Sequence, residues 1–344
     1  MNQPSGLSQT HNNLDCWHCP ACSGGLLADG EDAVVCSSCT SAYPAVEGIP
    51  DLRKPGVAES FVSGDLEEAK NVSRAWQESS IDGVAADISS RLARASELSD
   101  MRSQQIQEAP AKFTDQFEGW LKPYLGAEGG LLDIGCGTGG LLAAAATRGI
   151  QSAGIDASMV NLLAAKRMIL AAGGTPRLAC AFAESLPIPE HKFGLVTMYD
   201  SIEHVTGVAE TILQARRVLA VDGHMAISTP NRYSLSAEPH VRLWGVGFLP
   251  RRYQAAYVKW RTGDDYSQTC LLSSAEMSRL LEASERLTYW FILPSIPEQE
   301  IRLFSARRAM LARLYNRLVA STLLRPVFLT IGPFYQVVAR RDSP

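Results

Sequence analysis

The sequence contains no apolar run long enough to cross a membrane as a helix. Such a helix needs about 18 or more apolar residues in a row, and the longest candidate, 318–331, is broken by Arg325 and Pro326. Nor is there an excess of positive charge, because 32 Lys and Arg residues face 36 Asp and Glu residues and leave a formal net charge of −4 at pH 7. Binding to nucleic acid depends on clustered positive charge. The composition therefore argues against a general nucleic-acid-binding protein.

A secretory signal is also missing from the polar start of the chain, which predicts a cytoplasmic protein. The 344 residues contain no internal repeat and leave room for one full α/β domain and one smaller unit. Residues 1–15 are polar and without periodicity, so we expect a disordered tail there. Residues 56–109 are acidic and rich in helix formers, which predicts a helical linker or lid.

Half of the eight cysteines fall into a pattern typical of metal binding. Two C-x-x-C pairs, with thirteen residues between them, can each present two thiolates from one tight turn. Four thiolates suit tetrahedral zinc, and a closed set leaves no open coordination position, so we expect a structural ion. The alternatives are a redox pair or a disulfide, which a reducing cytoplasm disfavours, and a shifted ligand set that uses Cys16 or His18. The expected ligands are Cys19, Cys22, Cys36 and Cys39.

Together with the segment 43–50 that follows it, this pattern resembles the small zinc ribbon of Trm112-like proteins, which is often fused to bacterial methyltransferases. We therefore expect a zinc ribbon over residues 16–55. Some ribosomal RNA methyltransferases use a cysteine-rich ribbon to contact RNA. Between Leu14 and Asp51, however, this chain has no Lys or Arg, and phosphate binding needs positive charge. The sequence thus argues against an RNA-binding face on the ribbon.

The segment 131–139, Leu-Leu-Asp-Ile-Gly-Cys-Gly-Thr-Gly, is typical of a buried strand followed by a glycine-rich turn into a helix. It resembles the first motif of class I S-adenosylmethionine (SAM) dependent methyltransferases, an acid followed by Gly-x-Gly-x-Gly. A dinucleotide fold with Gly-x-Gly-x-x-Gly is the competing interpretation, and Gly140 leaves that spacing open. The negative charge of an acidic residue before the turn would repel a pyrophosphate but attract a positively charged cofactor. Asp133 therefore favours SAM over a dinucleotide. The resemblance implies cofactor contacts at Asp133, Gly135, Cys136, Gly137 and Gly139.

Two further segments extend this resemblance. The predicted strand 152–155 ends at an acid 23 residues after Asp133, where a carboxylate is placed to accept both ribose hydroxyls. The segment 183–187, Ala-Glu-Ser-Leu-Pro, matches the family's Asp-Ala-Glu-x-Leu-Pro, except that Phe182 replaces the aspartate on the adenine amino group. We therefore expect the adenine to be held by backbone groups and by stacking. The implied cofactor contacts are Asp156, Ala157, Ala183 and Glu184.

After a third predicted strand near 178–182, a fourth at 195–199 leads into Asp-Ser-Ile-Glu-His-Val at 200–205. This segment resembles the Leu-Glu-His-Val segment that lies beside the methionine end of SAM in quinone-type and sugar-type methyltransferases. The exit of a strand is also where open α/β sheets place reacting groups. The resemblance implies cofactor contacts at Tyr199 and Asp200.

Candidate bases for the acceptor come from this segment and from the one that follows the fifth strand. His204 is the first candidate, because His titrates in the useful range, and the plainer alternative is that it satisfies local hydrogen bonds. Glu203 with His204 is also a candidate pair for a divalent ion, although adjacent residues rarely face one ion from a helix. His240 and Tyr233 are further candidates for the base.

After a predicted helix at 209–219, a turn at 221–224 and a fifth strand at 225–228, the charge becomes positive. Cap insertions at about 233–270 and 295–330 contain Arg among aromatic and apolar residues. They suit an acidic, planar or carrier-bound acceptor held by stacking and bidentate pairing, and an ordinary solvated surface is the alternative. Four apolar residues of the second insertion fit one helical face, which we expect to pack on the protein's own core rather than on a membrane surface: Met310, Leu311, Leu314 and Leu318.

These observations predict an α/β protein with a Rossmann-like class I methyltransferase sheet over 110–344, an N-terminal zinc ribbon and helical C-terminal cap insertions. The expected reaction is in-line transfer of the SAM methyl group to oxygen or nitrogen of a small-molecule acceptor in secondary or specialised metabolism, with alignment supplying much of the catalysis. One rival is methylation of RNA or protein. A second is a cyclase that closes the aminobutyrate arm of SAM into a small ring amino acid and releases methylthioadenosine, and a third is a non-catalytic binding module that uses the ribbon to hold a partner.

Overall fold

The computed structural model describes most of the chain, with its main gaps in the N-terminal third. The described residues are 14–54, 59–77, 79–92, 109, 113–114, 117–126, 129–296, 298–302 and 304–343. Most of the expected tail at 1–15 and part of the expected linker or lid at 56–109 lie outside these residues. The chain forms two compact units: unit 1 contains residues up to 198 together with 213–225, and unit 2 contains 199–212 and 226–342.

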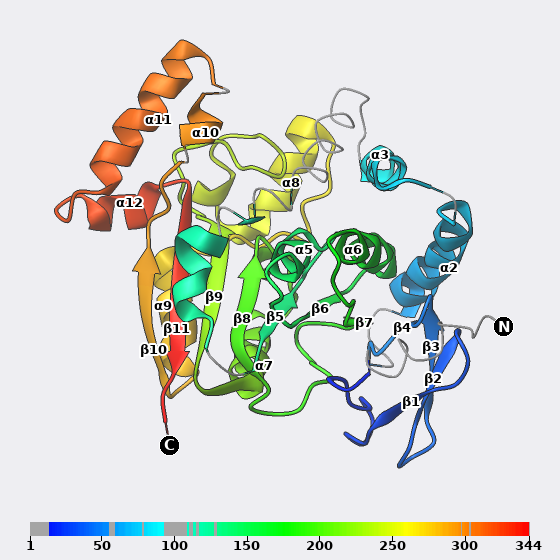
Figure 1. Ribbon diagram of the computed structural model, residues 1–344. Coiled ribbons are helices and arrows are strands. Elements are labelled where there is room, and N and C mark those ends of the chain that lie inside the picture. The colour runs from blue at the N-terminus through cyan, green and yellow to red at the C-terminus, as the bar shows by residue number, and fades with distance from the viewer. Residues whose placement is uncertain are drawn as a thin grey trace. The chain divides into compact units, whose positions relative to one another are not determined.

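The larger sheet contains seven strands: β5 (Leu131–Ile134), β6 (Ser152–Asp156), β7 (Leu178–Cys180), β8 (Phe193–Tyr199), β9 (Leu219–Pro230), β10 (Leu287–Ile292) and β11 (Phe334–Arg341). Their order is β10-β11-β9-β8-β5-β6-β7 (Figure 1). β5 pairs in parallel with both β6 and β8, and β6 pairs in parallel with β7. β10 and β11 pair antiparallel. This topology confirms the predicted Rossmann-like α/β class.

The central parallel strands are buried along almost their whole length, as strands covered on both faces should be. All four residues of β5 and the first six residues of β8 are buried. Helix α5 (Gly140–Ala146) follows β5, and helix α6 (Met159–Ala171) follows β6. Ser158 is the N-cap of α6, and its side chain accepts a hydrogen bond from the N–H of Asn161. The turns after β5 and β6 therefore lie side by side at the carboxyl ends of two adjacent strands.

The N-terminal segment of unit 1 forms its own antiparallel sheet of four strands: β1 (Leu26–Ala28), β2 (Ala33–Cys36), β3 (Ala42–Val46) and β4 (Ile49–Pro50). Beyond β4 the chain meets the end of β7. Asp51 forms a parallel bridge with Cys180, and the N–H of Leu52 donates to the carbonyl oxygen of Cys180 (2.8 Å). Helices α2 (Glu59–Ala75) and α3 (Ile81–Leu92) then contact α6 (Figure 1).

The remaining described helices are η1 (Phe117–Leu121), η2 (Lys122–Tyr124), η3 (Ile202–His204), α7 (Val208–Val218), η4 (Val246–Phe248), α8 (Arg251–Thr262), α9 (Ser274–Ala283), α10 (Glu298–Ile301), α11 (Ala306–Val319) and α12 (Arg325–Ile331). Within the part of the chain that the structure describes, none of the helices combines the length and the apolar content that crossing a bilayer requires. α7 lies within one residue of its predicted position at 209–219.

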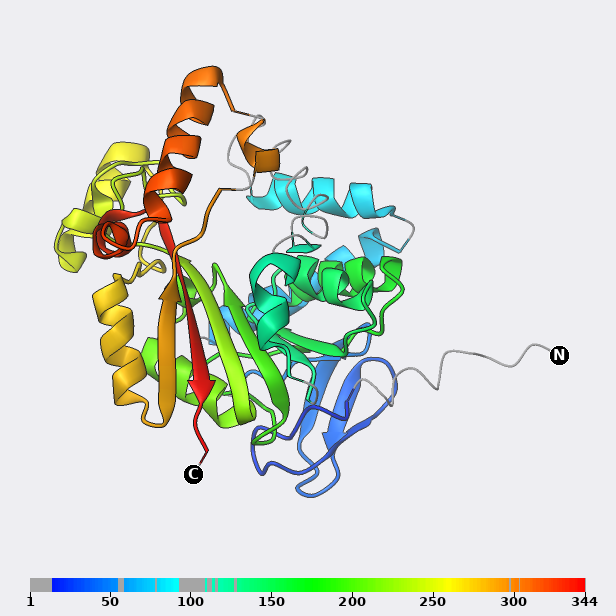
Figure 2. The same cartoon turned by 60° about the vertical axis from the view of Figure 1, so that its left-hand side comes forward.

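Two expectations about local structure are wrong. The predicted turn at 221–224 belongs to β9, where Asp222 takes a positive φ of 59°. The Asp-Gly pair thus marks an irregularity within a strand rather than a reversal of the chain. The second concerns α11, whose four apolar residues were expected in the core but are between 36% and 61% exposed. Its buried side consists of Ala309 and Ala312, which pack with Ile301 of α10. The two helices, drawn in orange in Figure 2, contact each other.

The first insertion, 233–270, has a small core of its own in unit 2. Val246, Val258 and Tyr266 form this core. Its two tryptophans do not contribute, because Trp244 is 61% exposed and Trp260 is 76% exposed. This part of unit 2 therefore presents large aromatic side chains on its surface.

Candidate functional site

The glycine-rich turn of unit 1 is tied to the neighbouring strand. The N–H groups of Gly135 and Cys136 both donate to the carbonyl oxygen of Ile155 in β6, at 2.9 Å each. The Cys136 side chain is buried, at 7% exposed. The backbone between β5 and α5 is therefore held in place from β6.

Glycine is required in this turn by the backbone and, at one position, also by packing. Gly137 and Gly139 have positive φ values of 51° and 81°, a region that residues with a Cβ rarely adopt. A Cβ at Gly139 would lie 2.7 Å from the Cβ of Ala165. A Cβ at Gly137 would meet no heavy atom of the described chain within 4 Å. The turn thus leaves open space beside Gly137, where a ligand can approach the backbone.

Asp156 at the end of β6 faces this turn. Its Oδ2 accepts from the N–H of Gly137 (2.9 Å), and its Oδ1 accepts from the N–H of Ser158 (2.9 Å) and from Nδ2 of Asn161 (3.3 Å). Burial raises the pKa of Asp156 above its ordinary value. A carboxylate has about four lone-pair positions, so one acceptor direction is left after these three bonds. A fixed carboxylate beside open space suits the ribose hydroxyls of a nucleoside such as SAM.

Asp133 lies deeper than the sequence suggested. It is 3% exposed, and its Oδ1 accepts a hydrogen bond from Thr197 Oγ1 in β8 (2.7 Å). Burial raises its pKa to about 7. The observed partner of this carboxyl group is therefore a neighbouring strand, and its predicted contact with the cofactor stays a prediction.

The third motif forms a compact turn after β7. The carbonyl oxygen of Phe182 accepts a hydrogen bond from the N–H of Ser185 (3.1 Å), which closes the turn. Ala183 and Glu184, between them, are half-buried. The guanidinium of Arg217 donates to two carbonyl oxygens of the following segment, 186–188, at 2.7 and 2.9 Å. Sequence reasoning did not find this arginine.

Unit 2 contains a buried carboxyl group at the exit of β8. Glu203 in η3 is fully buried, and its Oε2 accepts from Thr229 Oγ1 (3.0 Å). Among the described residues its Oε1 has no hydrogen-bond partner. Burial and the charge of Asp200 raise the pKa of Glu203 to about 7. Nearly all buried polar atoms in native proteins have a hydrogen-bond partner, so this oxygen makes Glu203 a candidate functional group.

Two histidines stand next to this carboxyl group. His240 Nδ1 lies 2.5 Å from Glu238 Oε1, and its Nε2 lies 3.8 Å from Glu203 Oε1. The rings of His204 and His240 meet edge to face, with centroids 4.8 Å apart. Burial alone would lower the pKa of His240, but the hydrogen bond and charge of Glu238 outweigh it and raise that pKa. Burial and the charge of His240 lower the pKa of His204.

The sequence argument against an ion shared by Glu203 and His204 did not foresee the geometry of this segment. Glu203, His204 and His240 each offer a ligand atom, and these atoms lie within 4.8 Å of one another. The argument assumed an α-helix, whereas η3 is a single 3-10 turn and His240 comes from a different segment. The three side chains form one group although two of them are adjacent in sequence.

Three other predicted residues of unit 2 lie outside this group. Tyr199 ends β8, and Asp200 follows with a φ of 48° and an N–H that donates to Ser228 O (2.9 Å). The ring of Tyr233 packs against Phe248, with centroids 5.8 Å apart, and under the guanidinium of Arg232. Glu238 was not predicted, although the Glu-Pro-His sequence at 238–240 is the signal that could have found it.

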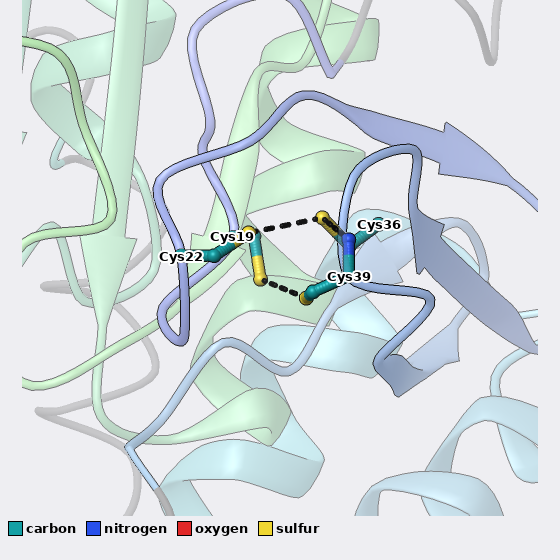
Figure 3. A group of neighbouring side chains, drawn as sticks. All are labelled: Cys19, Cys22, Cys36 and Cys39. Carbon is teal, nitrogen blue, oxygen red and sulfur yellow. Dashed lines mark hydrogen bonds between the residues drawn. The ribbon is translucent and has the colours of Figure 1, made fainter.

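The four predicted cysteines form one cluster in unit 1 (Figure 3). The Sγ atoms of Cys19 and Cys39 are 3.6 Å apart, and those of Cys22 and Cys36 are 3.5 Å apart. A tetrahedral zinc ion with Zn–S bonds of about 2.3 Å needs sulfur atoms about 3.8 Å apart, whereas a disulfide needs about 2 Å. The cluster therefore fits zinc, and Cys16 and His18 are not part of it.

Comparison with known proteins finds one matching family model and several similar proteins. A family model described as a methyltransferase domain matches residues 101–285. A ubiquinone biosynthesis O-methyltransferase of Bartonella quintana (strain Toulouse) is 27% identical over 151 residues, 44% of this chain and 57% of that protein. One of Bradyrhizobium sp. (strain ORS 278) is 34% identical over 102 residues, 30% of this chain and 40% of that protein. The solved structure of an S-adenosylmethionine dependent methyltransferase from Mesorhizobium loti aligns with a TM-score of 0.45 and 21% identity, over 66% of this chain and 98% of that one.

The chain spans about half the length of the curated relatives that it matches. The family model, in contrast, covers more than half of the 344 residues and includes the strands that carry the glycine-rich turn, the ribose-type aspartate and the Glu-His segment. With this match and the observed sheet, the chain belongs to the class I SAM-dependent methyltransferases.

Proposed function

We propose that the protein transfers the methyl group of SAM to an oxygen atom of a small-molecule acceptor. Family membership supports the reaction class. The names of the curated relatives, O-methyltransferases of ubiquinone biosynthesis, favour oxygen over nitrogen. The observation that carries the proposal is the pairing of His240 Nδ1 with Glu238 Oε1 at 2.5 Å. An imidazole held by a carboxylate through Nδ1 keeps Nε2 as the free basic nitrogen.

Unit 1 supplies the residues that hold the cofactor in this proposal. Asp156 accepts a hydrogen bond from a ribose hydroxyl in the one acceptor direction left by its three observed hydrogen bonds. The backbone beside Gly137 leaves room for the ligand, and backbone groups at Ala183 hold the adenine. When bound, SAM supplies a methyl group that the sulfonium charge has already made electrophilic.

The proposed proton acceptor is His240. A hydroxyl oxygen becomes a strong nucleophile as its proton leaves, so a base raises the rate of transfer to oxygen. His240 takes this role better than His204, because Glu238 raises the pKa of His240 and its charge stabilises the imidazolium that forms. Burial lowers the pKa of His204, which favours the neutral ring as a neighbour that shapes the site.

The cysteine cluster completes the proposal with a structural zinc ion. Four sulfur ligands leave no position for water or acceptor, so the ion stabilises the ribbon and takes no part in methyl transfer. Thiolates that bind zinc and carry no disulfide suit a reducing compartment such as the cytoplasm. The absence of Lys and Arg between Leu14 and Asp51 supports a small-molecule acceptor over RNA.

The test is to incubate the purified protein with methyl-labelled SAM, with and without a pooled metabolite extract, and to identify the products by mass spectrometry. We expect S-adenosylhomocysteine and a labelled small molecule only when the extract is present, and the NMR shift of the new methyl group should identify it as O-methyl. Methylthioadenosine formed from SAM alone would contradict methyl transfer and indicate the cyclase. Label that enters added RNA or protein instead would contradict a small-molecule acceptor. Asp156→Ala serves as the variant that should not bind SAM.

A further inference from the structure

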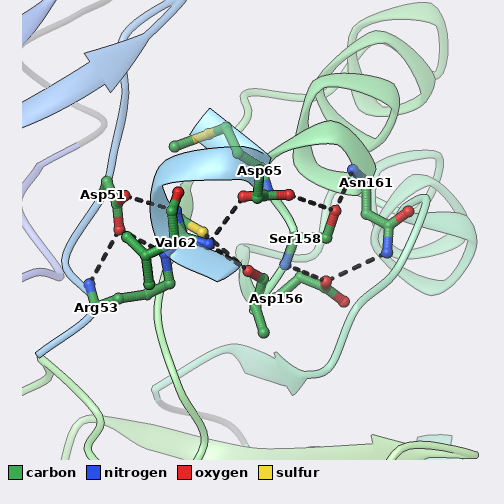
Figure 4. A network of polar contacts seen from close by, with 10 residues as sticks. Asp51, Arg53, Val62, Asp65, Asp156, Ser158 and Asn161 are labelled. Atoms are coloured by element: carbon green, nitrogen blue, oxygen red, sulfur yellow. Dashed lines mark hydrogen bonds and ion pairs between the residues drawn. The ribbon is translucent and has the colours of Figure 1, made fainter. Parts of the chain in front are cut away.

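A fully buried arginine joins the ribbon to the turn after β6 (Figure 4). The side chain of Arg53 is 0% exposed and lies between Asp51 and Asp65, which are 5% and 8% exposed. Its Nε and Nη2 donate to the two carboxylate oxygens of Asp51 (2.8 and 2.7 Å), and Nη2 also donates to the carbonyl oxygen of Val62 (3.4 Å). Its Nη1 donates to Asp65 Oδ2 and to the carbonyl oxygen of Ala157, both at 2.8 Å. All five N–H donors of the guanidinium are thereby used.

Asp65 extends this network to the start of α6. Its Oδ1 accepts from Ser158 Oγ (3.1 Å), and its Oδ2 accepts from the N–H of Met159 (2.9 Å). Ser158 is the N-cap and Met159 the first residue of α6. Asp65 therefore satisfies an N–H that the helix itself leaves unpaired, and its negative charge is favourable at this end of the helix.

The three residues that follow Asp156 are thus all held by a side chain from the segment that leaves the ribbon. Arg53 holds the carbonyl of Ala157, and Asp65 holds the side chain of Ser158 and the N–H of Met159. The N–H of Ser158 in turn donates to Asp156 Oδ1. The direction of the Asp156 carboxylate therefore depends on a backbone that Arg53 and Asp65 fix.

Packing alone does not account for this network. Contact between the ribbon segment and the sheet is already provided by Leu52 on β7 and by α2 on α6. Apolar side chains of similar size are often as stabilising as buried charges at such a contact. What buried charges add is direction, because each hydrogen bond fixes a donor against an acceptor.

We propose that Arg53 and Asp65 are positioning residues for the ribose of the cofactor, through which the ribbon segment sets the orientation of Asp156. This inference rests on the proposed function, in which Asp156 accepts a hydrogen bond from a ribose hydroxyl. The ribbon then contributes to cofactor affinity from residues that do not touch the cofactor. The contribution is specific to the ribose and independent of the adenine and of the amino-acid arm.

The test compares S-adenosylhomocysteine with its 2′-deoxy analogue, both titrated by calorimetry against the full-length protein. Wild type should bind S-adenosylhomocysteine more tightly than the analogue. Asp65→Asn keeps the size of the side chain but replaces an acceptor with a donor. Asp65→Asn should weaken the affinity for S-adenosylhomocysteine by about 10-fold or more, because losing a partner that orients a binding group typically has an effect of this size. Its affinity for the 2′-deoxy analogue should stay within about 2-fold of the wild-type value. Arg53→Lys keeps the positive charge but loses the planar, forked donor geometry of the guanidinium. This variant should also reduce the preference for the ligand with the 2′-hydroxyl.

A matched control is available at the other join between the ribbon and α6. Glu47, between β3 and β4, pairs with Arg167 (2.9 Å) and Lys166 (3.5 Å) of α6. These contacts lie outside the turn at 156–159. Glu47→Gln should leave the affinity ratio of the two ligands unchanged, even if it weakens the docking of the ribbon.

The outcomes separate this inference from the function on which it rests. If wild type binds neither ligand, both the proposed function and the inference are overturned. Equal binding of the two ligands by wild type would remove the ribose role of Asp156 and with it the inference, while SAM binding stands. If wild type prefers the ribose hydroxyl and Asp65→Asn keeps that preference, or if Glu47→Gln loses it equally, the inference alone is wrong.

Discussion

Substituting each of three glycines by alanine distinguishes two effects: the loss of stability caused by backbone strain in a turn, and the loss of SAM binding caused by a side chain in the cofactor site. Gly137, Gly139 and Gly149 have φ values of 51°, 81° and 66°. A left-handed conformation costs a residue with a Cβ about 1–2 kcal/mol, and the smaller entropy of the unfolded chain returns about 0.4–1 kcal/mol. Each Gly→Ala change should therefore cost about 1 kcal/mol of unfolding free energy from the backbone alone.

The surroundings then predict different outcomes for stability. At Gly139 the new Cβ would lie 2.7 Å from the Cβ of Ala165, and overpacking of this kind adds about 1–3 kcal/mol. At Gly137 and Gly149 it would meet no heavy atom of the described chain within 4 Å. In urea unfolding, Gly139→Ala should lose about 2–4 kcal/mol and the other two variants about 1 kcal/mol. If Gly149→Ala is as unstable as Gly139→Ala, the contact with Ala165 is not the cause.

Binding of SAM should divide the two mild variants. We propose that the cofactor lies in the space beside Gly137. The methyl group of the new alanine in Gly137→Ala should therefore clash with SAM and weaken the binding free energy by about 1–3 kcal/mol, or about 5- to 150-fold in Kd. Gly149→Ala has the same backbone cost outside the site and should bind SAM as wild type does. Equal binding by the two variants, measured by calorimetry, would refute the placement of the cofactor beside Gly137.

Three other changes test the electrostatics and the metal. Glu238→Gln removes the charge that raises the pKa of His240, so the acid limb of kcat/KM should move to lower pH by about 1–3 units; a limb that stays in place would exclude His240 as the titrating base. Burial raises the pKa of Asp133 from 3.8 to about 7, so wild type should lose stability as the pH rises through this window. The urea midpoint of Asp133→Asn should change less over that range, and equal pH dependence in the two proteins would contradict the assignment. Cys36→Ser combined with Cys39→Ser should abolish bound zinc, about one ion per chain in wild type by mass spectrometry, whereas full retention would refute the ligand set.

The sequence predicts those parts of the fold and site that depend on neighbouring residues. The strand and glycine turn at 131–139 and the two cysteine pairs are local patterns whose geometry follows from spacing. The cysteines meet because each pair sits on one turn and hairpin pairing brings the turns together. For the same reason the resemblance to the methyltransferase family could be recognised without a structure.

The sequence does not predict contacts between distant segments. Arg53 and Ala157 are 104 positions apart, and nothing near either residue indicates the other. Similarly, the apolar face of α11 follows from helical spacing, but whether anything covers that face depends on the path of the rest of the chain. Buried charge networks and exposed apolar faces are therefore the features for which the structure was needed.

The bridge between Asp51 and Cys180 also bears on the solubility of the molecule. β7 is the last strand of the larger sheet, and an uncovered edge strand presents N–H and C=O groups to which another chain can pair. Here the residues leaving the ribbon occupy the end of that edge, with Leu52 donating to Cys180. Asp51 and Leu52 thus cover this end of β7 and leave fewer backbone groups to which the edge of another sheet can pair. If the ribbon were transferred to another such protein, the residues that pair with β7 would have to be transferred with it. The unit that can be transplanted is therefore the ribbon together with the segment that follows β4.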